Sequence, residues 1–185
     1  MNDDLALRYW KAVADLPVDR RRALGELEAC FAGGAHPQAP SGRLEGRLLS
    51  TTFGHGLDGA FMLLARLWMP WKGKSLDAEA KGGRNLFTRG LRAPMRLLWP
   101  SYGDVRDEGA GLLSAFRFTT WDGSSAILPD TQVLKIDYDH EGSPTLAIRP
   151  ILDELVQIDE GLYLGQALMR RGGEFHRVAW FSLAG

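Results

Sequence analysis

The chain has 185 residues, of which 45% are hydrophobic and 24% are charged, an ordinary balance for a globular protein of one domain. Its formal net charge is −1, which argues against a general nucleic-acid-binding protein, because such proteins carry a basic excess. The single cysteine, Cys30, excludes an internal disulfide and a pair of cysteine metal ligands.

The chain is expected to be cytoplasmic and not to insert into a membrane. The first residues, MNDD, contain neither a basic segment nor an apolar run, so no secretory signal is visible. The longest apolar segment, 57–71, is too short to span a bilayer and is interrupted by Asp58 and Arg66.

The first 33 residues are predicted to form two helices. The pair Asp3-Asp4 can cap the first helix, and Pro17 suits the start of the second. Gly33-Gly34 is expected to end the second helix, and a loop follows over residues 33–41.

From residue 42 onward, short strands are predicted with one intervening helix. The helix, at 57–69, has so little polar surface that we expect it to be buried on most sides. Strands are expected at 42–53, 84–88, 112–121, 132–138 and 145–148. The segment 91–99 is ambiguous because Pro94 interrupts a helix-like pattern. Residues 150–158 are predicted to form one or two helical turns.

The C-terminal residues 161–185 are predicted to form a β-hairpin, because Gly172-Gly173 lies between two strand-like runs. If Arg171 pairs with Glu174, then Gly165 pairs with Trp180. Neither face of this hairpin is polar, whereas a sheet with one side in water is polar on that side. We therefore expect a barrel lumen to cover one face and helices to cover the other.

The expected fold class is α+β. Short strands separated by turn residues indicate an antiparallel sheet or barrel. Small barrels fill their lumen with side chains or hold one ligand. We expect an antiparallel β-barrel with N-terminal helices and one buried helix packed on it. The chain 1–185 is then a single domain, made of a helical segment, 1–33, and a barrel-like region, 40–185.

Several motifs follow one another from Pro40 onward. They are the glycine-flanked strand GRLEG, the segments WKGKSLDAE, GGRNLFTR, SAFRFTTWDGSSA and PILDELVQIDEGLYLG, and a closing strand that contains Trp180-Phe181. This order resembles a calycin-like family of unknown function named for a GXWXG motif, although Leu44 stands where the family's tryptophan would be. The resemblance implies a barrel related to lipocalins and fatty-acid-binding proteins, and an apolar ligand. It implies no reaction.

Arginines on apolar strands are the candidates for binding a ligand. Arg117 and Arg177 both have aromatic neighbours, and a guanidinium can bind a ligand carboxylate with two hydrogen bonds. The alternative is that each arginine pairs with a nearby acidic residue at an edge or rim. The predicted ligand-binding residues are Arg177, Arg117, Gln166, Phe116, Phe118, Tyr163, His176 and Trp180.

No cofactor and no metal site are expected. His55, between two glycines, could ligate haem iron, with His176 as an alternative, but a turn residue is the simpler interpretation. Asp137, Asp139 and His140 are close in sequence. They adjoin a predicted turn, where acidic residues are usually solvated, so they do not predict a metal centre.

The leading functional hypothesis is binding of a small hydrophobic or amphipathic, fatty-acid-like molecule in a barrel cavity. No GxSxG, HExxH, P-loop or GxGxxG motif is present, so no reaction is predicted. One alternative is an interaction or structural protein with a filled barrel, in which a homodimer could cover the hairpin. The other is a cavity enzyme of the isomerase or cyclase type, with His176 or Asp137 as its base.

Overall fold

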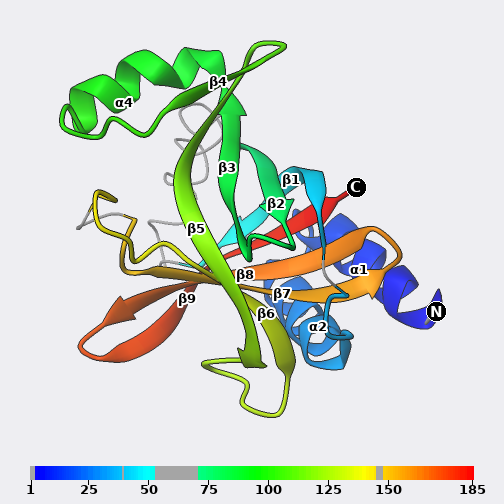
Figure 1. The fold of residues 1–185 in the computed structure, drawn as a ribbon. Coiled ribbons are helices and arrows are strands. Elements are labelled where there is room, and N and C mark those ends of the chain that lie inside the picture. The colour runs from blue at the N-terminus through cyan, green and yellow to red at the C-terminus, as the bar shows by residue number, and fades with distance from the viewer. Residues whose placement is uncertain (1–2, 39, 53–70, 145–147) are drawn as a thin grey trace.

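The computed structural model describes residues 3–38, 40–52, 71–144 and 148–185 (Figure 1). Its elements in chain order are α1 (Asp3–Asp15), α2 (Arg20–Gly33), β1 (Gly42–Thr51), β2 (Trp71–Asp77), β3 (Gly82–Thr88), the 3-10 turn η1 (Arg89–Leu91), α4 (Arg92–Leu98), β4 (Arg106–Gly109), β5 (Leu112–Ser124), β6 (Gln132–Asp137), β7 (Ile151–Asp159), β8 (Leu162–Arg171) and β9 (Glu174–Ala184). No helix in these ranges is long and apolar enough to cross a bilayer.

The strands form one antiparallel sheet that closes on itself. Their order is β3-β2-β1-β9-β8-β7-β6-β5-β4, and β3 also pairs with β5, which closes an eight-stranded barrel with β4 beside it. The predicted α+β barrel with N-terminal helices is therefore confirmed. The helix predicted at 57–69 and most of the strand predicted at 145–148 lie outside the described residues.

Helices α1 and α2 cover the outer face of the barrel beside β7 (Figure 1). The side chain of Asp19 accepts a hydrogen bond from the backbone N–H of Arg22, so α2 begins at residue 20 rather than near Pro17. Phe31 of α2 packs edge-to-face on Trp180 of β9, with ring centroids 5.6 Å apart. An apolar layer that includes Cys30 thus separates the helices from the sheet.

A second apolar core fills part of the barrel interior and includes Phe118, Leu155 and Phe181. Together the two cores cover both faces of the terminal hairpin. This arrangement explains why neither face of that hairpin is polar.

The register of the hairpin agrees with the prediction near the turn and differs beyond it. Arg171 pairs with Glu174, and Leu168 pairs with Arg177. Val178 is then an extra residue in a β-bulge, so Gly165 pairs with Phe181 and not with Trp180. The bulge turns Phe181 into the barrel and leaves Trp180 in the outer core.

Residues 150–158 do not form helical turns, because β7 occupies 151–159. The sequence ILDELVQID has apolar residues at helical spacing, which suggested a helix. Six of the nine residues of this strand are buried and the other three are partly buried, because one face meets the barrel interior and the other meets the helices. In α4, by contrast, Pro94 lies in the first turn, where its missing N–H costs no helical hydrogen bond.

Candidate functional site

A cavity of about 570 Å³ lies in the barrel and extends to α4 and its flanking residues. Its volume is in the range of small-molecule sites. Most of its wall is apolar, with large contributions from Trp71, Phe87, Met95, Trp99, Phe116 and Phe181.

Four polar side chains meet at this cavity, and we call them the polar cluster: Lys74 of β2, Asn85 of β3, Tyr138 after β6 and Asp153 of β7. The ammonium Nζ of Lys74 donates to Asp153 Oδ2 at 2.8 Å, to Asn85 Oδ1 at 2.9 Å and to the Tyr138 hydroxyl. The Tyr138 hydroxyl donates to Asp153 Oδ2 at 2.8 Å. The cluster is therefore a closed network built from strands far apart in the sequence.

Burial dominates the electrostatics of the polar cluster. The side chain of Lys74 is 2% exposed, and burial lowers its pKa while the charge of Asp153 opposes that shift. The ring centroids of Trp71, Phe118, Tyr138 and Phe181 lie 5.2–5.6 Å from Nζ. Their π-faces add further stabilisation to the ammonium.

The Tyr138 phenol is expected to remain protonated well into alkaline solution. Burial, followed by the nearby charge of Asp153, raises its pKa well above the usual 10. A raised phenol pKa contributes stability below the unfolded-state pKa and loses it as pH rises through the folded-state value. Tyr138→Phe should therefore lower the free energy of unfolding at neutral pH and flatten its decline above pH 10.

Denaturant unfolding at several pH values would measure this effect. Tyr163→Phe is a suitable control, because burial also raises the pKa of Tyr163, but less markedly. Equal alkaline slopes for the Tyr138→Phe variant and the unmodified protein would contradict the prediction.

Trp71 and Gly46 organise the cavity wall beside the polar cluster. A Cβ atom on Gly46 would lie 2.5 Å from the Trp71 ring, so only glycine allows the indole to lie against β1. The indole N–H donates to Asn85 Oδ1 at 3.1 Å. Leu44 of that strand is a buried interior residue. The tryptophan that packs over the glycine-flanked strand therefore comes from β2.

Phe116 also borders the cavity and has an unusual backbone conformation. Its φ is +51°, and it is the extra residue where β5 bulges against β3. Its N–H donates to the Tyr102 hydroxyl at 2.6 Å, and the two rings stack with centroids 5.1 Å apart. A non-glycine residue in this conformation is strained, and such strain is concentrated at binding sites.

The eight predicted ligand-binding residues do not form one site. Phe116 borders the cavity, whereas Phe118 and Tyr163 belong to the interior core next to it. Trp180 lies in the outer core, and His176 is exposed near the hairpin turn.

Arg177 lies on the outer face of the barrel and not in the lumen. Its Nη1 forms an ion pair with Glu28 of α2 at 2.5 Å, and its Nε donates to Gln166 Oε1 at 2.7 Å. The guanidinium also lies 4.2 Å from the ring centroid of Trp180. Pairing with a nearby acid, the alternative considered for this arginine, is the observed arrangement.

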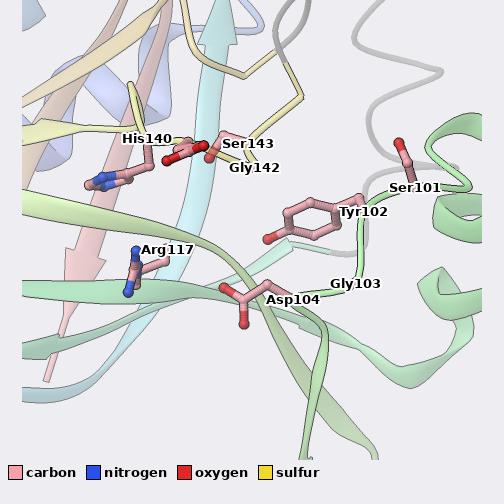
Figure 2. Close-up of a pocket in the computed structure, with 9 residues that line it drawn as sticks. Ser101, Tyr102, Gly103, Asp104, Arg117, His140, Gly142 and Ser143 are labelled. Carbon is pink, nitrogen blue, oxygen red and sulfur yellow. The ribbon is translucent and has the colours of Figure 1, made fainter.

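Arg117 lies on the outside of β5, at a second and smaller pocket of about 160 Å³. Figure 2 shows its guanidinium between the His140 ring and the Asp104 carboxylate. Asp104 is held by Arg84, with Nη2 to Oδ1 at 2.8 Å. The buried Nε2 atom of His140 has no hydrogen-bond partner among the described residues.

The candidates for metal and haem ligands are also dispersed. His55 lies outside the described residues. Asp139 pairs with Arg149 and Arg170, and Asp137 accepts the backbone N–H of Asp139. Among the residues with a described position, no group of three histidine, cysteine or acidic side chains is arranged to hold a metal ion. Neither Asp137 nor His176 borders the barrel cavity.

Comparison with known proteins supports the fold and nothing finer. No family model matches the sequence, and no curated protein matches it. A crystal structure of a protein from Thermomonospora curvata is similar over 96% of this chain and 97% of that chain, with a TM-score of 0.52 and 14% identity. At this identity the likeness shows the fold alone. The calycin-like resemblance therefore stays a prediction.

Proposed function

We propose that the protein binds a small hydrophobic or amphipathic molecule inside its barrel. The observation that carries this proposal is a mostly apolar cavity of about 570 Å³ whose described wall includes the polar cluster. Sites for small molecules are typically of this size, mostly apolar, and equipped with a few polar groups that orient the ligand. The apolar wall would hold the body of the ligand, and the polar cluster would face its polar end.

The cavity also distinguishes this proposal from the alternative of a filled barrel. The interior core packs the barrel around Leu155 and Leu183, but the side chains near α4 leave space. Ala167 of β8 and Ala179 of β9 are paired and both border that space. Small side chains at paired positions of a barrel wall enlarge the room available to a ligand.

Filling the cavity should weaken ligand binding without unfolding the protein. Ala167→Phe places a ring in the space and is expected to weaken binding of an apolar probe by about tenfold or more, equivalent to at least about 1.4 kcal/mol. Displacement of a fluorescent fatty-alcohol or fatty-acid probe would measure the affinity, and thermal unfolding would confirm that the fold is intact.

Arg177→Met is the matched control, because Arg177 is bound to Glu28 outside the barrel and should not affect the cavity. Native mass spectrometry of the purified protein would identify any retained ligand. Unchanged probe affinity in Ala167→Phe, or no bound molecule and no thermal shift across a broad lipid panel, would refute the proposal.

A further inference from the structure

The polar cluster has no net charge, because its one cation and its one anion balance each other. Lys74 and Asp153 form an ion pair at 2.8 Å, and transfer of a proton between them would leave the sum unchanged. Among the described residues that line the cavity, the one other charged residue is Arg47, but its side chain is exposed and its charge acts on Tyr9 of α1, in the outer core. The part of the wall that the structure describes therefore directs no unpaired charged side chain at an ionised head group.

The hydrogen-bonding capacity of the cluster is also nearly used up. The three N–H groups of Lys74 have acceptors in Asp153, Asn85 and Tyr138, and the Tyr138 hydroxyl donates to Asp153. Both of the hydrogen bonds to Asp153 reach Oδ2. Oδ1 accepts none from the residues whose positions are described. The ion pair of Lys74 and Asp153 therefore offers a ligand a hydrogen-bond acceptor, Asp153 Oδ1, and not a donor.

We infer that the polar end of the ligand is uncharged and donates a hydrogen bond to Asp153 Oδ1, as an alcohol, a phenol or a primary amide would. This inference rests on the proposed function. A carboxylate would add a second negative charge beside Asp153 without a free cation to balance it, and an alkylammonium would face the Lys74 charge. Burying either unbalanced ion in an apolar cavity is costly, whereas a neutral hydroxyl needs only one partner.

Three probes that share one alkyl chain test this inference on the unmodified protein. Decanol, decanoate and decylamine differ only at the head group, and isothermal titration calorimetry at neutral pH gives their affinities. Decanol is expected to bind about tenfold or more tightly than either ion. Decanoate affinity equal to or above that of decanol would overturn the inference while leaving the proposed cavity function intact. Failure of all three to bind would refute the proposed function itself.

Two single variants test the same inference, because each should reduce the preference for the uncharged head group. Asp153→Asn leaves Lys74 without its counter-ion, so the ratio of decanoate to decanol affinity should rise by about tenfold or more. Lys74→Met leaves Asp153 without its counter-ion, so the ratio of decylamine to decanol affinity should rise instead. Folded variants that keep the original ranking would overturn the assignment of the head group to this cluster. If either variant fails to fold, the order of decanol, decanoate and decylamine affinities in the unmodified protein still tests the inference.

Discussion

Asp153→Ala is expected to reduce the free energy of unfolding by about 3–5 kcal/mol, the range observed when one partner of a buried ion pair is removed. Asp153 is 5% exposed and is the only carboxylate bound to Lys74 among the described residues. Its loss leaves the Lys74 ammonium and the Tyr138 hydroxyl without their shared acceptor. Urea-induced unfolding at neutral pH would measure the change.

The double variant Lys74→Met/Asp153→Leu is the control that separates charge from packing. It removes both ions and keeps apolar volume, so it should recover most of the stability lost in Asp153→Ala. Arg8→Ala, which removes an exposed ion pair with Glu26, should change stability little. A small loss in Asp153→Ala would contradict the account of a Lys74 ammonium that is held away from water, at 2% exposure, by its ion pair with Asp153.

Gly73→Ala is expected to destabilise the fold by at least about 2 kcal/mol, because backbone strain and overpacking each cost on the order of 1–3 kcal/mol. The φ of Gly73 is +130°, a conformation that residues with a Cβ rarely adopt. A Cβ there would also lie 1.9 Å from the backbone oxygen of Leu44. Because Gly73 lies between Trp71 and Lys74, the same change should weaken probe binding.

Gly25→Ala is the matched control for Gly73→Ala. Gly25 lies in α2, and a Cβ at that position would meet nothing within 4 Å. Alanine is favoured over glycine in a helix by roughly 0.8–1 kcal/mol, so this variant should be more stable than the unmodified protein. Equal stability of the two alanine variants in thermal and urea unfolding would contradict the account of the β1–β2 contact.

Local patterns predicted the fold well where turn chemistry controls the chain. Gly172 and Gly173 both have positive φ in the hairpin turn, as their sequence indicated. The pairing stayed correct as far as Arg177 and then shifted at the bulge around Val178. A bulge between two apolar strands has no strong signature in the sequence. Here it accompanies a tertiary contact, the packing of Trp180 against Phe31 of α2. Tertiary contacts therefore decided which face each aromatic residue occupies.

The site was much harder to predict than the fold. Lys74 of β2, Tyr138 after β6 and Asp153 of β7 are far apart in the sequence, and a lysine or an acid usually points to solvent. The sequence pattern instead favours Arg117 and Arg177, which have aromatic neighbours, as ligand-binding residues. In the structure, Arg177 is bound by Glu28 and Arg117 is exposed outside β5. The pair Asp153-Glu154 lies in the otherwise apolar segment 150–158, for which the sequence pattern predicts helical turns and the structure has strand β7.

That pair also has a consequence for the chain before the barrel closes. Asp153 and Glu154 alternate across β7, so Asp153 faces Lys74 in the interior, while Glu154 accepts hydrogen bonds from Ser125 and Gln166 on the outer side. Without them, 151–158 would be an uncharged, β-prone segment of the kind that associates with copies of itself. Two adjacent carboxylates make such stacking between unfolded chains repulsive. We therefore expect the same acids, which have partners in the finished barrel, to reduce association between unfolded chains.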